Sequence, residues 1–133
     1  MHSISKLRNF RYTASIPLDM KAVFKQQPTY RPSVFMRSAG YAPYTNNEGV
    51  ESFVRRVSGG GEFPRFHIYV EDQKNPATLS IHIDQKGHSY TGVKAHSGEY
   101  LGQAIADELA RISAAIGLPM AILVDKKGKP LER

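Results

Sequence analysis

The sequence contains no cysteine, no tryptophan and no long run of apolar residues. The absence of cysteine excludes disulfide bridges, thiolate metal sites and cysteine nucleophiles. No segment reaches the roughly 20 apolar residues that a membrane-spanning helix needs, and the first residues lack the apolar core of a signal peptide. We therefore expect a cytoplasmic protein that does not enter a membrane.

Acidic side chains are also scarce in the first third of the chain. Residues 1–47 carry seven basic side chains and one acid, Asp19, while the remaining residues are balanced in charge. This segment thus accounts for the formal net charge of +6. A basic excess confined to one region is an indication of contact with polyanions, nucleic acids above all.

The length of 133 residues predicts a single domain, residues 1–133, with one hydrophobic core. Within the basic N-terminal region, residues 28–47 contain three prolines and three tyrosines. Such a composition is typical either of an ordered loop or of a flexible arm. The sequence leaves both alternatives open, and with a flexible arm the N-terminal region 1–47 would be partly flexible.

The central stretch, residues 63–86, reads FPRFHIYVEDQKNPATLSIHIDQK. Apolar and polar side chains alternate over 65–72 and again over 77–85, which predicts the two strands of a β-hairpin. With Asp72 opposite Ala77, every apolar residue of one strand meets an apolar residue of the other. The predicted pairs are Phe66 with Ile83, Ile68 with Ile81, Val70 with Leu79, His67 with His82, and Arg65 with Asp84.

Weaker patterns predict three elements in the N-terminal region. A strand over residues 10–16 is expected to end at Pro17. The apolar spacing predicts two turns of helix over 19–26 with Asp19 as the N-cap, and a short strand over 34–37.

Three further elements complete the predicted fold. A helix is expected over 48–57 because its four apolar residues follow the i, i+3, i+4, i+7 spacing of one buried stripe. A long helix over about 98–116, with Ser97 as its N-cap, precedes a final strand over about 120–125 whose continuous apolar run indicates burial on both faces.

The expected fold class is therefore α+β, in two layers, with a mixed, mainly antiparallel sheet built around the central hairpin. The long helix should cover the apolar face of the hairpin, and a crossover from the hairpin through this helix to the last strand would join parallel strands. The opposite face of the hairpin, which carries His67 and His82 and which we call the histidine face, would then be exposed to solvent or covered by the helix over 48–57.

The block from Phe66 to Ile112 contains HIDQKGHSY followed by AHSGEYLGQAIADELARI. It resembles a scattered group of small uncharacterised bacterial proteins that share this strand motif and this helix start. The resemblance covers about a third of the chain. It implies a bacterial source and a common fold, and it implies no catalytic residue because the group has no established activity.

The histidine face is the first candidate site. His67 and His82, opposite each other on neighbouring strands, could act as general acid and base on a phosphodiester, with Asp84 beside them and Arg65 as a phosphate clamp. With a ligand from the following loop, the same groups could bind zinc. The alternative is an ordinary polar sheet surface, and we assign no metal and no cofactor. Tyr69 would help to orient a phosphate.

The basic aromatic N-terminal surface is the second candidate site. Its cations are interspersed with aromatic residues, a mixture expected where phosphates are neutralised and bases stack. The alternative is a solvated face whose aromatic residues belong to the core. The expected nucleic-acid-binding residues are Arg8, Arg11, Lys21, Lys25, Arg31, Arg37, Arg65 and Tyr69.

Three functions follow from these candidates. The leading hypothesis is a small nucleic-acid-binding protein that prefers RNA to DNA. The second is a metal-independent phosphodiesterase or ribonuclease that uses the two histidines. The third is an interaction protein whose basic arm binds an acidic protein partner.

Overall fold

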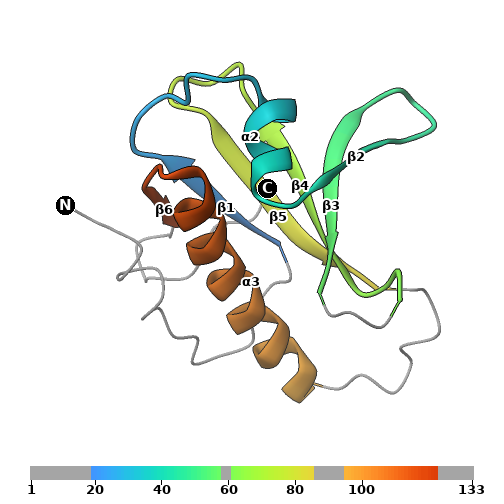
Figure 1. Cartoon of the computed structure of the whole chain (residues 1–133). Helices are drawn as coiled ribbons and strands as arrows, with labels where there is room; N and C mark the ends of the chain where they lie inside the picture. Colours follow the sequence, from blue (N-terminus) through green and yellow to red (C-terminus); the bar gives the residue numbers. More distant parts are fainter. Residues whose placement is uncertain (1–18, 58–60, 86–94, 123–133) are drawn as a thin grey trace.

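The computed structural model describes residues 19–57, 61–85 and 95–122. They form one six-stranded antiparallel sheet in the order β2-β3-β4-β5-β1-β6, with two helices on one side of it (Figure 1). The two-layer α+β prediction is confirmed. The strands are β1 (Asp19–Phe24), β2 (Ala42–Thr45), β3 (Glu51–Arg56), β4 (Arg65–Glu71), β5 (Thr78–Asp84) and β6 (Met120–Ile122), and the helices are α2 (Pro32–Ser38) and α3 (Ala95–Ile116).

The central hairpin has the register that the sequence predicts. Strands β4 and β5 pair so that His67 lies opposite His82 and Arg65 opposite Asp84. The three apolar pairs also match the prediction. Because side chains alternate between the two faces of a strand, this register collects the apolar residues on one face and the polar residues on the other.

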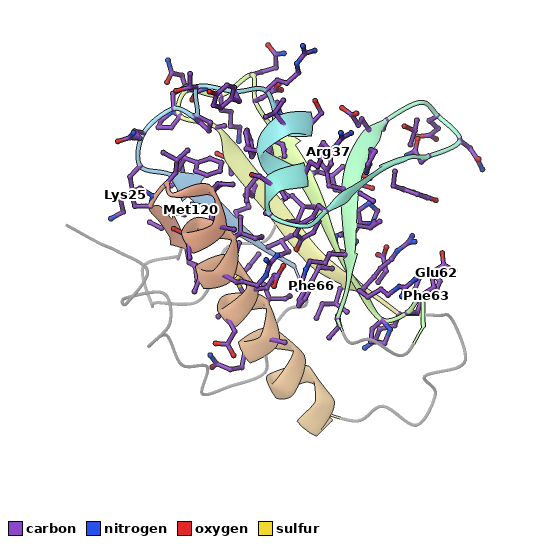
Figure 2. All side chains as sticks on the ribbon, viewed as in Figure 1. Lys25, Arg37, Glu62, Phe63, Phe66 and Met120 are labelled. Carbon is purple, nitrogen blue, oxygen red and sulfur yellow. The ribbon has the colours of Figure 1, made fainter. Side chains whose placement is uncertain are left out.

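The hydrophobic core lies between the sheet and the two helices. From α3, Ile105, Leu109 and Ile112 are fully buried. From α2, the ring of Phe35 packs edge-on against Phe24 of β1, with the ring centroids 5.5 Å apart. Figure 2 shows Phe66 and Met120 from the sheet layer of this core.

The connection from β5 through α3 to β6 joins parallel strands. Both strands belong to the same sheet, and β1 lies between them, antiparallel to each. β6 is therefore an edge strand, and only Met120 of its three residues is fully buried. The prediction that this strand is buried on both faces was therefore wrong.

Two predictions in the N-terminal region were wrong. Residues 19–24 form strand β1 rather than a helix, because Met20, Ala22 and Phe24 point alternately into the core and β1 inserts between β5 and β6. Residues 32–38 form helix α2 rather than a strand. Pro32 lies in the first turn of α2, where a backbone N–H would have no acceptor within the helix, so the lack of this group in proline costs no hydrogen bond.

The predicted helix over 48–57 is also wrong, because these residues contribute strand β3 and the turn that precedes it. The Asn46 side chain closes this turn by accepting hydrogen bonds from the backbone N–H groups of Glu48 and Val50, both at 2.9 Å. Gly49 adopts φ 82°, a conformation that glycine tolerates best. The pairing of β2 with β3 then outweighs the helical spacing of the apolar residues.

The long helix starts earlier than predicted. α3 begins at Ala95, so Ser97 lies inside it and is not the N-cap. The predicted strand over 10–16 lies outside the described residues.

The packing of β5 yields a prediction about stability. Leu79 is fully buried and lies opposite Val70 on one side and Ala22 on the other. Leu79→Ala should lower the free energy of unfolding by about 2–5 kcal/mol, because it removes apolar burial and leaves a cavity. Urea denaturation measures this change. Val50→Ala, at a 44% exposed side chain, is the control and should change stability by less than about 0.5 kcal/mol; equal losses would contradict this placement of the core.

Candidate functional site

The face of the sheet opposite the helices carries the polar side chains of the hairpin. We call it the polar sheet face. One row across it places Arg56 of β3 beside Arg65 of β4 and Asp84 of β5. The next row contains Val54, His67 and His82. These rows hold the candidate catalytic residues within one small area. The polar sheet face includes Lys21, Tyr44, Ser52, Val54, Arg56, Arg65, His67, Tyr69, Glu71, Ser80, His82 and Asp84.

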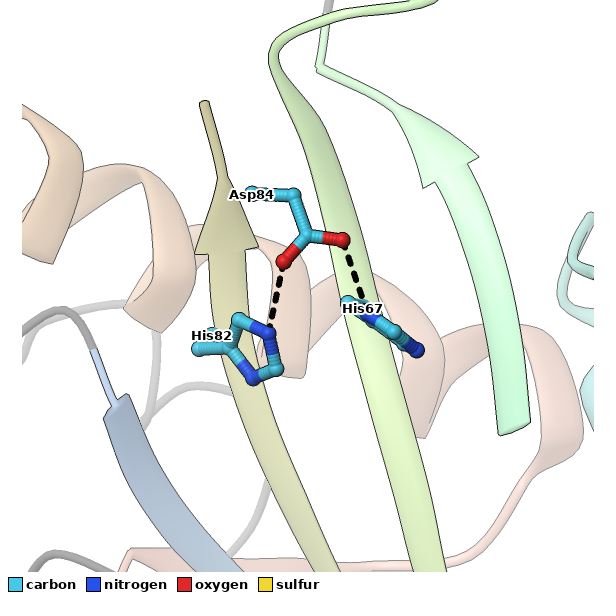
Figure 3. A group of neighbouring side chains, drawn as sticks. All are labelled: His67, His82 and Asp84. Carbon is cyan, nitrogen blue, oxygen red and sulfur yellow. Dashed lines mark hydrogen bonds and ion pairs between the residues drawn. The ribbon is translucent and has the colours of Figure 1, made fainter. Parts of the chain in front are cut away.

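Asp84 is the centre of this area (Figure 3). One carboxylate oxygen lies 2.7 Å from His67 Nδ1, and the other lies 2.7 Å from His82 Nε2. Arg65 Nε donates a hydrogen bond to the first oxygen at 3.1 Å. Partial burial of the Asp84 carboxyl opposes its ionisation, but the hydrogen bonds from the two histidines and the arginine outweigh burial and hold its pKa well below its ordinary value.

A second hydrogen-bond chain leaves His67 on its other side. Its Nε2 lies 2.7 Å from Ser52 Oγ, and the Ser52 hydroxyl donates to the Tyr44 carbonyl at 3.0 Å. Ser52 and His67 are 1% and 5% exposed. Ser52, His67 and Asp84 thus have the connectivity of a serine-protease triad, yet the serine is inaccessible to a substrate. Both ring nitrogens of His67 are occupied by protein groups.

Aromatic rings surround His67. Tyr69 stacks on it with centroids 4.8 Å apart, and Tyr44 approaches it edge-on at 5.7 Å. His82 lies at 4.9 Å. This packing fixes the orientation of the imidazole and explains the low exposure of His67.

A cleft of about 620 Å³ opens beside the polar sheet face, where β3 ends. Three arginines line it, and Glu62 is the only acidic residue among the lining residues. Arg65 is held between the rings of Tyr44 and Phe63, 4.9 and 4.6 Å from their centroids. We call this the arginine cleft. Its lining residues are Gly40, Ala42, Val54, Arg55, Arg56, Val57, Glu62 and Arg65.

A buried carboxylate anchors one of these arginines from the helical side. Glu108 of α3 is 4% exposed, and it accepts a hydrogen bond from Arg55 at 3.3 Å. Arg111 donates two more bonds to it, at 2.9 and 2.8 Å, and the Tyr41 hydroxyl donates one at 2.7 Å. The carboxylate is therefore saturated by donors. Burial, and then the negative charge of Glu108, raise the pKa of Tyr41 well above its ordinary value.

Arg56 differs from the other two cleft arginines. Its side chain is exposed, and no ion pair or hydrogen bond joins it to another side chain in the described parts of the chain. Arg65 is paired with Asp84 and Glu62, and Arg55 with Glu108. Arg56 is thus the cleft cation most available to an added anion.

The structure separates the residues that the sequence assigned to the basic surface. Arg65, Tyr69 and Lys21 lie on the polar sheet face, and Lys21 pairs with Glu71 at 3.7 Å. Lys25, Arg31 and Arg37 are exposed in the segment from the end of β1 through α2. Figure 2 labels Lys25 and Arg37 in this segment. Arg8 and Arg11 lie outside the described residues. The described members of this set do not form one surface.

The sequence interpretation missed the arginine cleft and the Ser52 hydrogen bond. The predicted helix over residues 48–57 contained Ser52, Arg55 and Arg56. In such a helix the two arginines would be ordinary solvated cations. The alternation of Ser52, Val54 and Arg56 in ESFVRR could have indicated a strand, as could the turn-forming NNEG that precedes it.

Comparisons with known proteins add no assignment to this geometry. A scan against protein-family models, a search of curated proteins and a search of solved structures found no match to the chain. Within the described ranges, neither helix combines the length and the apolar composition that a membrane span requires.

The Tyr41–Glu108 bond yields a prediction about pH. The folded pKa of Tyr41 lies above the value of about 10 in the unfolded chain, so its stabilising contribution is complete below that pH and is lost as pH rises through the folded pKa. The free energy of unfolding should therefore fall more steeply between about pH 9 and 11 in the wild type than in Tyr41→Phe. Urea denaturation across this range measures the slopes.

Tyr30→Phe provides the control for this measurement. Tyr30 is 67% exposed, so its removal should leave the pH dependence of the wild type unchanged. Equal slopes for the wild type and Tyr41→Phe would show that the buried tyrosine does not govern stability in this range.

Proposed function

We propose that the protein binds single-stranded RNA, with a backbone phosphate in the arginine cleft and a base against Tyr44. The observation that carries the proposal is the exposed Arg56, which has no side-chain partner among the described residues, in a cleft lined by two further arginines. The proposal keeps Arg65 from the residues expected from the sequence and Tyr44 from the basic aromatic region, but it replaces the N-terminal cations by Arg55 and Arg56.

The charge distribution of the cleft suits a phosphodiester. Arg55 and Arg65 are held in place by buried or half-buried carboxylates, so they are preorganised and their positions cost little entropy on binding. Arg56 brings the uncompensated charge. A guanidinium can donate two parallel hydrogen bonds to phosphate oxygens, which makes arginine well suited to this ligand.

Tyr44 supplies a stacking surface next to the cleft. Its side chain is 39% exposed, and its ring is braced by the guanidinium of Arg65. Bases stack on such rings only when they are not paired within a duplex, so the arrangement favours a single strand. Each stacked base typically contributes about 1–3 kcal/mol.

RNA is preferred to DNA in this proposal because of the polar groups around the stacking surface. Tyr69 and His82 lie on the same sheet face and are half-buried. A phenol such as that of Tyr69 can hydrogen-bond to a ribose 2′-hydroxyl, the group that distinguishes RNA from DNA, whereas His82 Nε2 is already bonded to Asp84.

The histidine geometry favours binding over catalysis. A general acid or base needs a ring nitrogen that can reach the substrate. Both nitrogens of His67 are engaged, by Asp84 and by Ser52, at 2.7 Å. The acid–base pair would therefore have to break a buried hydrogen bond before acting, and the ribonuclease hypothesis stays a prediction for the same assay to test.

Fluorescence anisotropy with labelled single-stranded RNA tests the proposal. With one backbone phosphate neutralised in the cleft, the slope of log K against log salt should be at least as steep as about −0.7, because each phosphate neutralised on a single strand contributes about −0.7. Arg56→Ala should weaken binding and reduce the magnitude of the slope by about 0.7.

Lys25→Ala is the matched control, because it also removes one exposed positive charge but lies near the opposite edge of the sheet, where its backbone N–H bonds to Pro119. It should leave the affinity almost unchanged. Equal effects of the two substitutions would show that binding depends on the net charge of the protein and not on the cleft. Absence of binding at low salt would refute the proposal.

The same samples distinguish the alternatives. Single-stranded DNA and duplex RNA of equal length should bind more weakly than single-stranded RNA. On a denaturing gel the RNA should stay intact, whereas shortened RNA that depends on His67 would favour the ribonuclease.

A further inference from the structure

We infer that His67, His82 and Asp84 form a binding site for a divalent first-row transition metal such as Zn²⁺. The inference is separate from the proposed RNA binding and revises the sequence-based assignment of no metal. Two imidazoles and one carboxylate converge from adjacent strands, and one ligand atom from each lies within 4.8 Å of the others (Figure 3).

The hydrogen-bond chain through Ser52 determines which nitrogen of His67 carries hydrogen. A serine hydroxyl has one hydrogen, and Ser52 gives it to the Tyr44 carbonyl. The contact between Ser52 Oγ and His67 Nε2 is then one in which the ring donates. Nδ1 is then the nitrogen that faces the Asp84 carboxylate, with which it forms a hydrogen bond.

The contact of 2.7 Å between His67 Nδ1 and the Asp84 carboxylate requires a hydrogen between the two atoms. A metal ion bound at this place would replace that proton. Asp84 lies in the same relation to His82, whose Nε2 is 2.7 Å from the second oxygen. The carboxylate between the two imidazoles therefore defines one site where a single ion can contact all three groups.

The three ligand atoms lie within 4.8 Å of one another, and they reach the spacing of a zinc site only after a small rearrangement. Ligands about 2.0–2.2 Å from a tetrahedral ion are separated from one another by about 3.3–3.5 Å. Each N···O pair would therefore have to widen by about 0.6–0.8 Å on metal binding. Nitrogen and carboxylate ligands in this combination suit zinc, cobalt and iron rather than calcium or magnesium.

The surrounding contacts resemble the outer shell of known metal centres. A metal-bound histidine usually donates its other ring N–H to an oxygen, as His67 does to Ser52, and a bound carboxylate usually accepts a further hydrogen bond, as Asp84 does from Arg65. The charge of Arg65 opposes a second cation and will limit the affinity. With three protein ligands, the fourth position remains open to water or to an oxygen of a ligand.

Titration of the full-length, tag-free protein with Co²⁺ tests the inference through its visible absorption, with Zn²⁺ displacing it. One equivalent should bind to the wild type. Asp84→Asn and His82→Gln should each lower the affinity at least about tenfold, and Ser52→Ala should lower it about 10–100-fold through the orientation of His67.

Glu71→Gln is the matched control for Asp84→Asn. It removes one carboxylate charge from the same sheet face, where Glu71 bonds to Ser80 and pairs with Lys74 and Lys21. Its metal affinity should equal that of the wild type. Unchanged affinity in Asp84→Asn and His82→Gln would place any bound metal on other residues and overturn the inference.

A measurement on the wild type alone covers the case in which a variant does not fold. Side-chain ¹⁵N resonances of His67 Nδ1 and His82 Nε2 should shift on addition of one equivalent of Zn²⁺, while His67 Nε2 keeps the signal of a protonated nitrogen. Absence of shifts at both nitrogens would mean that a proton occupies the site, and it would refute the metal.

Discussion

The antiparallel register of β4 against β5 is the constraint on which the site depends. A slip of one residue would turn every side chain of one strand to the opposite face, sending His82 and Asp84 into the core and Ile81 and Ile83 to the polar face. The burial of the apolar pairs therefore enforces the histidine pair. Stability of the core and geometry of the polar cluster have the same origin.

Two buried or half-buried carboxylates organise the charges on opposite faces of the sheet. Asp84 holds Arg65 on the polar face, and Glu108 of α3 holds Arg55 on the helical face. Both arginines line the same cleft at the end of β3, and Arg56 lies between them in sequence without such a partner. The fold thus places two structural ion pairs and the exposed Arg56 side by side in one cleft, and among the described residues Arg56 has no side-chain partner.

The sequence predicted the hairpin because both strands are adjacent in the chain and each alternates clearly between apolar and polar residues. It failed for β1, whose partners β5 and β6 lie far away along the chain, and for β3, although its partner β2 lies only one turn before it. Met20, Val23 and Phe24 have the spacing of one helix face. Met20, Ala22 and Phe24 have the alternation of one strand face equally well. Local patterns did not distinguish the two structures, and tertiary pairing decided between them.

Local patterns also limited what could be predicted of the candidate site, because they do not reveal which distant strands pair. His67, His82 and Asp84 could be placed together because the hairpin register alone does so, whereas Ser52 reaches His67 only through the pairing of β3 with β4.

The outer strand β2 has a consequence for the behaviour of the protein in concentrated solution. An exposed sheet edge presents free backbone groups that can recruit a strand from another molecule and start aggregation. β2 is only four residues long, and Pro43 in its middle has no N–H to offer. This edge is therefore a poor template for pairing with a strand of another molecule.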